Sequence, residues 1–290
     1  MDWLHLANRF IRRSLVAQGV ESRTVRLRGA DVHYYRAERG GSGPPLLLVH
    51  GLGSSANAFF KTLLPLARSF RAVYAVDLPG NGFSPVPNAG PMPVREQVEL
   101  LRDFRRELIG EPVFLLGNSL GGGMSLNFAF QEPEALLALG LVSPAGAQIS
   151  EERFQQLVQS FSVKTTSDAR TLAGKLYAKP PLSVMLFANE LRKMMTTDTV
   201  KSAISQVSRA DLVQPEQLQA LPMPTLLIWG QSERLLPYEG LDFFRAHLPS
   251  HAEVHEVSGF GHMPQMEHPH AFVERVRKFA VGRGLVQAAA

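Results

Sequence analysis

The sequence of 290 residues has no cysteine and no long uninterrupted hydrophobic stretch. The absence of cysteine excludes disulfide bonds, a thiol nucleophile and thiolate metal sites. No apolar run approaches the roughly 20 residues that a membrane-spanning helix needs. Hydrophobic residues nevertheless make up 45% of the chain, which is too many for a disordered protein. A globular protein of one large or two modest domains is therefore expected.

The net positive charge of the protein is confined to one end of the chain. The formal charge is +4, and residues 1–30 alone hold six arginines against two acidic residues. The remaining residues are therefore balanced in charge. This distribution does not indicate a globally basic nucleic-acid-binding protein, so no nucleic-acid partner is expected.

The basic end, residues 1–22, has the pattern of an amphipathic helix. Its apolar residues recur near helical spacing and arginines interrupt them: Trp3, Leu4, Phe10, Ile11, Leu15 and Val16. A secretory signal needs a continuous apolar stretch of roughly 7–15 residues and a small-residue cleavage site, and neither is present. We therefore expect a cytoplasmic protein. Three interpretations stay open: a helix docked on the domain, peripheral contact with an anionic membrane through residues 1–16, or a disordered terminus.

Short apolar runs alternate with helical patterns through most of the chain. Near-continuous apolar runs are typical of strands buried on both faces of a parallel sheet. We expect such strands at 46–50, 72–77, 113–118, 136–142 and 225–230, after an antiparallel pair at 24–27 and 32–37. Helical patterns, such as 94–109 and 120–130, separate them. The alternation predicts an α/β fold with helices on both faces of the sheet.

The alternation stops within residues 145–222. This segment has helical periodicity, a Pro180-Pro181 break and no convincing strand. We expect a helical subdomain there, inserted into a core formed by residues 23–144 and 223–290.

The strongest local motif is Gly117-Asn118-Ser119-Leu120-Gly121, which follows an expected strand and precedes a helix. A serine in such a turn adopts a strained backbone that lifts its hydroxyl off the carboxyl edge of the sheet. The start of the helix favours developing negative charge there. We predict Ser119 as a nucleophile; the alternative is a glycine-rich turn needed only for packing.

Serine is a poor nucleophile unless a base takes its proton, so position must select among nine histidines. His262 follows the expected last strand at 253–258. The loop after a parallel strand opens on the same edge as Ser119. His268 and His270 fall at the start of the next helix, and His50 ends an earlier strand, where it would shape a turn. We therefore predict His262 as the base.

The third member of such a triad is a carboxylate that orients the imidazole. Glu233 is the first carboxylate after the strand at 225–230, and it is the predicted acid. Asp77 is a competitor, although it opens a segment with the composition of a structural turn. Asp242, further along the following helix, is a second competitor.

The order Ser119, Glu233, His262 resembles that of the α/β-hydrolase fold. The resemblance covers residues 24–281. Further matching segments are the oxyanion loop at His50-Gly51-Leu52-Gly53, the turn after the fourth strand at 77–84, the acid loop at 229–233, and the histidine loop at 261–264 with Glu267 and Pro269. The resemblance implies a mostly parallel twisted sheet with helices on both faces and a helical cap, which would be the insertion.

Several positions depart from the family pattern or narrow it. The family most often has aspartate in place of Glu233, and glutamate is one methylene longer, so its loop must sit further back. Histidine is usual where Asn81 stands, which we interpret as a neutral change. Ser119 argues against epoxide hydrolases and dehalogenases, which attack with aspartate. Met263 stands where carbon–carbon bond hydrolases commonly have tryptophan, and Leu120 where proline iminopeptidases have a bulky aromatic residue.

The resemblance implies a serine hydrolase that transfers an acyl group to water. Backbone N–H groups of Leu52 and Leu120 would donate hydrogen bonds to the oxyanion. No metal and no organic cofactor is implied. The expected activity is that of an esterase or lipase on a small-molecule or lipid ester. The alternatives are a carbon–carbon bond hydrolase of ring-cleavage products and a non-catalytic ligand-binding protein on the same scaffold.

Apolar side chains are frequent in the expected cap and beside the base. Methionine adapts to irregular apolar ligands, so an apolar acyl chain is predicted. The expected substrate contacts are Gly51, Met263, Phe187 and Met185. An equally supported alternative is that the cap residues form the cap's own core, so the length of the acyl chain stays open.

Overall fold

The computed structural model describes residues 3–287, which contain one eight-stranded sheet. Its strands are β1 (Glu21–Leu27), β2 (Ala30–Ala37), β3 (Leu46–Val49), β4 (Val73–Val76), β5 (Val113–Asn118), β6 (Leu136–Val142), β7 (Thr225–Gly230) and β8 (Glu253–Val257). They are ordered β1-β2-β4-β3-β5-β6-β7-β8 across the sheet. β2 is antiparallel to both β1 and β4, and the later pairings are parallel. The predicted mostly parallel sheet with an antiparallel start is confirmed.

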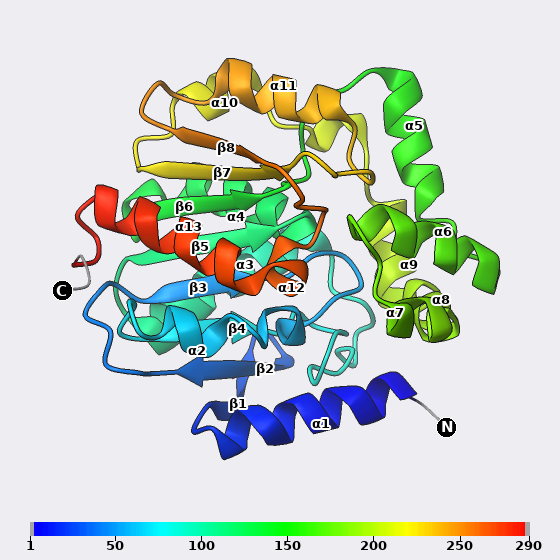
Figure 1. Cartoon of the computed structure of the whole chain (residues 1–290), viewed down its shortest axis with the longest axis horizontal. Coiled ribbons are helices and arrows are strands. Elements are labelled where there is room, and N and C mark those ends of the chain that lie inside the picture. The colour runs from blue at the N-terminus through cyan, green and yellow to red at the C-terminus, as the bar shows by residue number, and fades with distance from the viewer. Residues whose placement is uncertain (1–2, 288–290) are drawn as a thin grey trace.

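Helices cover both faces of this sheet (Figure 1). On one face lie α3 (Val94–Phe104), α4 (Leu120–Gln131) and α11 (Tyr238–His247), and on the other α2 (Leu63–Leu66) and α13 (Pro269–Gly282). Side chains of β3 alternate between the two resulting cores. Leu47 and Val49 lie in the first core, and Leu46 and Leu48 in the second. This two-sided burial explains why the strands read as continuous apolar runs.

The predicted helix at 94–109 is continuous but changes its winding. α3 is α-helical to Phe104 and continues as the π-helical turn η2 (Arg105–Ile109). Gly110 follows with φ +77°, a conformation that glycine adopts without strain, and it ends the helix. The other ends agree with expectation to within a few residues, since helix ends depend on capping contacts.

Between β6 and β7 the chain leaves the sheet and forms helices beside the carboxyl edge of the strands (Figure 1). These helices are α5 (Glu151–Ser160), α6 (Thr166–Leu176), α7 (Leu182–Leu186), α8 (Ala188–Met195), α9 (Asp198–Ser205), the short turn η4 (Arg209–Asp211) and α10 (Pro215–Gln219). A separate small core, which includes Leu172, Met195 and Val200, holds this helical insertion together.

The chain begins with α1 (Trp3–Ala17), which lies along the β1–β2 edge of the sheet (Figure 1). β1 starts at Glu21, so the predicted N-terminal unit 1–22 contains the beginning of the sheet. Of the predicted units, residues 1–2 and 288–290 lie outside the described range. None of the described helices combines the length and apolar character required to cross a membrane.

Candidate active site

Ser119 occupies a strained turn at the carboxyl end of β5. The strand ends at Asn118 and α4 begins at Leu120, which leaves one residue to reverse the chain. Ser119 has φ +56° and ψ −121°, and it is one of three non-glycine residues with positive φ in the described chain. A side chain rarely adopts this conformation, because it costs about 1–3 kcal/mol. The turn directs Ser119 away from both strand and helix.

Close packing around this turn requires its glycines. A Cβ atom on Gly117 would lie 2.1 Å from the carbonyl oxygen of Gly121. A Cβ atom on Gly121 would lie 2.4 Å from the carbonyl oxygen of Val49 in β3. Gly51 is also close, since a Cβ there would lie 3.0 Å from the Cβ of Ser119. The segment after β3 is therefore pressed against Ser119.

His262 and Glu233 form a buried pair at the same edge. His262 Nδ1 lies 2.7 Å from Glu233 Oε2, and both side chains are almost fully buried. Glu233 Oε1 accepts hydrogen bonds from the backbone N–H groups of Leu235 and Leu236, at 2.7 and 3.1 Å. These contacts fix the carboxylate, whose second oxygen faces the imidazole.

The surroundings of Glu233 favour its charged form. Burial by itself would raise the pKa of this carboxyl. The adjacent His262 and the two backbone donors outweigh burial and hold the pKa below its ordinary value. An ionised carboxylate can only accept, so His262 carries its proton on Nδ1 and leaves Nε2 as a proton acceptor.

The competing carboxylates have other partners. Asp77 accepts from His33 Nδ1 at 2.7 Å and from the backbone N–H groups of Ala56 and Phe83. Asp242 lies on α11, where it pairs with Arg245 at 3.6 Å near the surface. Of the three carboxylates considered, Glu233 is the one in contact with His262.

Asn118 ties the serine turn to the histidine loop. Its Nδ2 donates to the carbonyl oxygens of Val142 and His262, each at 3.0 Å, and its Oδ1 accepts from Gln265 Nε2. Sequence reasoning did not find Asn118 or Gln265, because nothing in the sequence specifies a side-chain partner so far along the chain. Ser119 Oγ itself hydrogen-bonds no described residue. Hydrogen bonds within a catalytic site are often long or absent until a substrate binds.

Two backbone N–H groups beside Ser119 lack an acceptor. Neither Leu52 nor Leu120 donates a backbone hydrogen bond to any residue between 3 and 287. Leu120 is the first residue of α4, where orphan N–H groups and the helix dipole attract negative charge. Leu52 follows Gly51, which packs on Ser119. Both groups are thus available to a negatively charged oxygen.

His50 and Asp77 hold the segment after β3 in place. His50 Nδ1 donates to the Gly51 carbonyl at 2.8 Å, and its Nε2 accepts from the Leu78 N–H at 3.1 Å. The second bond needs a neutral ring, because a protonated Nε2 could not accept. Burial lowers the pKa of His50, against smaller opposing effects of Asp77 and the Gly51 carbonyl. Its role is to shape a turn, as the sequence predicted.

The helical insertion packs against the segment at 51–53, which the sequence predicted as the oxyanion loop. Leu52 packs with the core of the insertion. A Cβ on Gly53 would lie 3.3 Å from Met195 Sδ and 3.3 Å from a methyl of Val200. Of the predicted substrate contacts, Gly51 and Met263 lie next to Ser119 and His262. Met185 belongs to α7 and is half-buried, and Phe187 directly follows that helix and is exposed; the role of both stays a prediction.

Glu267 joins the insertion to the histidine loop. It ends α12 (Pro264–Glu267), and its Oε2 accepts from the Gly261 N–H at 3.1 Å. Its Oε1 accepts from the N–H of Ala178, directly after α6, at 2.7 Å. The neighbouring Tyr177 is buried, which, with a smaller contribution from Glu267, raises the pKa of its phenol to about 12.

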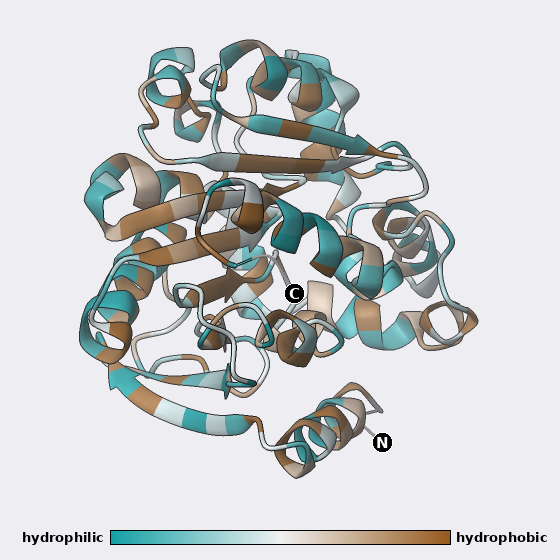
Figure 2. Cartoon of the chain, turned by 60° about the vertical axis from the view of Figure 1, so that its left-hand side comes forward, coloured by the Kyte–Doolittle hydropathy of each residue, from teal (hydrophilic) through white to brown (hydrophobic). Residues whose placement is uncertain are grey.

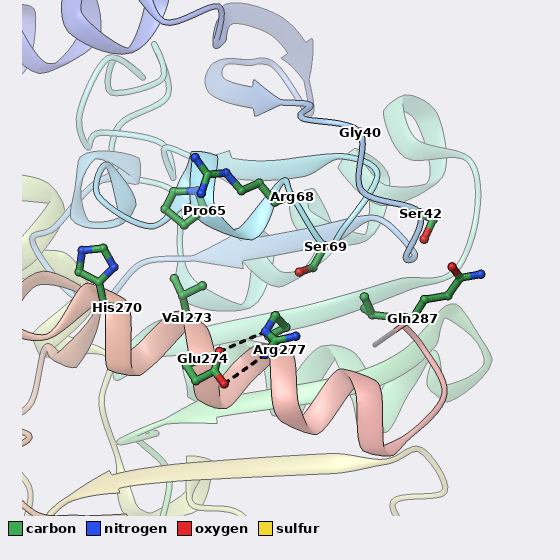
Figure 3. Close-up of a pocket in the computed structure, with 11 residues that line it drawn as sticks. Gly40, Ser42, Pro65, Arg68, Ser69, His270, Val273, Glu274, Arg277 and Gln287 are labelled. Carbon is green, nitrogen blue, oxygen red and sulfur yellow. Dashed lines mark hydrogen bonds and ion pairs between the residues drawn. The ribbon is translucent and has the colours of Figure 1, made fainter. Parts of the chain in front are cut away.

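The described residues also contain a pocket of about 570 Å³ at another place (Figure 3). Arg68, His270 and Arg277 line it, and Arg277 is held by Glu274 of its own helix at 3.1 Å. The pocket contains none of Ser119, Glu233 and His262. Within residues 3–287, no group of three or more histidine, aspartate or glutamate side chains is arranged to hold a metal ion.

A mostly parallel eight-stranded sheet with a strained serine after β5 defines an α/β hydrolase. The chain matches the model of the alpha/beta hydrolase fold over residues 44–269, and it belongs to that family. A pimeloyl-[acyl-carrier protein] methyl ester esterase of Xanthomonas oryzae pv. oryzae is 29% identical, over 82% of this chain and 96% of its own. The monoacylglycerol lipase ABHD6 of Bos taurus is 26% identical, over 87% of this chain and 79% of its own.

A similar solved structure is that of a membrane phospholipase A described as a bacterial virulence factor. It superposes with a TM-score of 0.83 at 25% identity and covers 97% of this chain and 91% of its own. Together with the family match, these relatives support a hydrolase.

Proposed function

We propose that the protein is a carboxylic ester hydrolase that acts through Ser119, His262 and Glu233. The observation that carries this proposal is Ser119, held at φ +56° at the sheet edge that also holds the buried His262–Glu233 pair. The free N–H groups of Leu52 and Leu120 support it, because acyl transfer needs an oxyanion site. The names of the relatives, an esterase and two lipid hydrolases, agree with ester substrates.

In the proposed reaction, Ser119 Oγ attacks the ester carbonyl carbon while His262 Nε2 takes the hydroxyl proton. The carbonyl oxygen becomes an anion that Leu52 and Leu120 stabilise, and each such donor contributes about 3–4 kcal/mol. Glu233 holds the imidazolium in position. His262 gives its proton to the leaving alcohol, and an acyl-enzyme remains. Water, deprotonated by His262, then attacks the acyl carbon and releases the acid and Ser119.

The helical insertion would act as the cap that binds the acyl chain. Met195 and Val200 face the oxyanion loop, and Leu52 packs with them. An apolar acyl group would take up contacts with these side chains when the cap moves aside. This placement supports apolar acyl esters as substrates, with Met263 beside the base.

The test is hydrolysis of a series of p-nitrophenyl esters from acetate to palmitate. We expect turnover by the native protein and a loss of at least about a thousandfold in kcat for Ser119→Ala. Ser162→Ala, a change on the surface of the insertion, is the matched control and should keep full activity. Full activity in Ser119→Ala would refute the proposed mechanism.

Two other outcomes would favour the alternatives. Cleavage of a vinylogous diketone without ester turnover would identify a carbon–carbon bond hydrolase. Saturable binding of the esters without turnover of either compound would indicate a ligand-binding protein on this scaffold.

A further inference from the structure

One face of α1 fixes the helix to the domain. Leu15 is buried in the second core. One turn or two earlier on the same face, Asn8 Oδ1 accepts from Asn57 Nδ2 at 2.9 Å, and the Arg12 guanidinium lies 4.9 Å from the centre of the Phe83 ring. Since residues three, four and seven apart share a helix face, these contacts determine which side of α1 points outward.

The opposite face of α1 consists of Leu6, Arg9, Phe10 and Arg13, and we call it the outer face. Leu6 is 49% exposed and Phe10 is 74% exposed. Arg9 and Arg13 are exposed and have no hydrogen-bond or ion-pair partner among residues 3–287. α1 contains no acidic residue, so nothing in the helix offsets this charge. Figure 2 shows brown and teal alternating along the helix.

We propose that the outer face docks on the surface of an anionic phospholipid bilayer. A helix that lies in the plane of the interface buries apolar side chains near the acyl boundary and keeps basic ones at the phosphates. Phe10 and Leu6 supply the apolar contact, and Arg9 and Arg13 supply the charge that anionic lipid attracts. Arginine can also bury its stem while its guanidinium stays at the headgroups.

A second exposed apolar element, α7, lies in the helical insertion. Figures 1 and 2 both place the helical insertion on the side toward which the N-terminal end of α1 points. There, Leu182 and Leu186 of α7 are 75% and 68% exposed. Residues 177–189 include one lysine and no acidic residue. This stretch therefore adds no negative charge that an anionic surface would repel.

This orientation would place the lipid about one helix diameter, roughly 10 Å, from the segments that follow the carboxyl ends of β3 and β4. The docked face of α1 contacts Asn57 and Phe83, which lie in the segments after β3 and β4.

A second copy of the chain is a poorer occupant of the outer face. A symmetric contact would bring Arg9 and Arg13 of both copies together with no acidic residue of α1 to neutralise them.

The experiment is flotation of the full chain with vesicles of phosphatidylcholine alone or with about 30% phosphatidylglycerol, at low and high salt. We expect binding to the anionic vesicles only, weakened by salt. Arg9→Glu/Arg13→Glu should lower the partition constant by about twentyfold or more, since each arginine near an anionic surface contributes about fivefold. Phe10→Ser should lower it by about tenfold.

The matched control is Arg95→Glu/Lys278→Glu, which changes the net charge by the same amount as Arg9→Glu/Arg13→Glu but at exposed positions on α3 and α13. This control should bind as the native protein does. Arg9→Gln/Arg13→Gln serves as a milder variant should the double reversal fail to fold. Equal binding to neutral vesicles, no binding at all, or native-like binding by the folded arginine variants would overturn the proposal. Loss of a dimer in Phe10→Ser, without vesicle binding by the native chain, would assign the face to a second copy.

Hydrolysis of a water-soluble p-nitrophenyl ester by the same variants separates this proposal from the proposed function. All α1 variants should keep that turnover. Vesicle binding depends on the outer face, whereas soluble-ester turnover depends on Ser119, so either proposal can fail while the other stands.

Discussion

The carboxyl of Glu233 is buried yet charged, because three donors surround it. His262 Nδ1 and the N–H groups of Leu235 and Leu236 each lie within 3.1 Å of one of its oxygens. Its pKa is consequently below the unfolded value of 4.5. A carboxyl with a depressed pKa binds fewer protons folded than unfolded, so it stabilises the fold above pH 4.5. That contribution is lost as the pH falls through the folded value.

We predict that Glu233→Gln lowers the free energy of unfolding at neutral pH by about 1–3 kcal/mol, since its amide leaves a buried donor unpaired. The difference from the native protein should begin to narrow below pH 4.5, where Glu233 takes up a proton in the unfolded chain, and it should narrow further until the folded carboxyl is protonated as well. Urea unfolding at neutral and acidic pH measures both values. Glu216→Gln, an exposed change on α10, is the control. A difference that stayed constant with pH would mean that the carboxyl is not charged in the folded protein.

The sequence could suggest Ser119, His262 and Glu233 because each follows an expected strand, and parallel strands share one carboxyl edge. The structure brings Glu233 and His262 into contact, while their catalytic role remains the proposal made above. The support around them could not be predicted. Asn118 and Gln265 form a hydrogen bond only because two turns far apart in the chain lie side by side. The sequence alone does not indicate which polar side chains will pair in this way.

Among the elements, the central strands β3 to β7 were the easiest to predict, since burial on both faces makes each of them an apolar run. The helical insertion was harder. Its helices α5 to α9 are short and half-exposed, so periodicity indicated helix but not where each one begins and ends. Contacts between the insertion and the sheet, such as Met195 against Gly53, depend on how the helices pack.

Glu267 connects α12, the histidine loop and the end of α6, and this connection is testable. In Glu267→Gln the amide NH₂ would face one of the backbone donors Gly261 and Ala178, and losing a hydrogen bond to a charged group costs about 1.5–3 kcal/mol. We expect kcat/KM for long-chain esters to fall by about tenfold, with a smaller effect on acetate, because the insertion would be less firmly placed over the site.

The control for this variant is Glu274→Gln on α13, which removes a surface pair with Arg277 and should leave the kinetics unchanged. Thermal unfolding separates positioning from general destabilisation. An equal loss for short and long esters, in step with a lower Tm, would assign Glu267 a purely structural role.

For the molecule as a whole, α1 is attached by one face and exposed on the other. Substitutions on the two faces should therefore change the free energy of unfolding by different amounts. Leu15→Ala should lower the free energy of unfolding by about 2–4 kcal/mol, because the buried leucine leaves a cavity in the second core. Phe10→Ala should change it by less than about 0.5 kcal/mol. Chemical denaturation of both variants checks this, and a large loss from Phe10→Ala would mean that the outer face is covered by protein.

The helical insertion also separates two neighbouring strands, β6 and β7, that are far apart in the chain. Their pairing requires the closure of a long loop, and the lost chain entropy precedes any stabilising contact. β3, β4, β5 and β6 have shorter connections and can pair without it. We expect the half of the sheet that holds Ser119 to form early, and β7 and β8, with Glu233 and His262, to join late. Ser119 and the His262–Glu233 pair would then come together only in the final stage of folding.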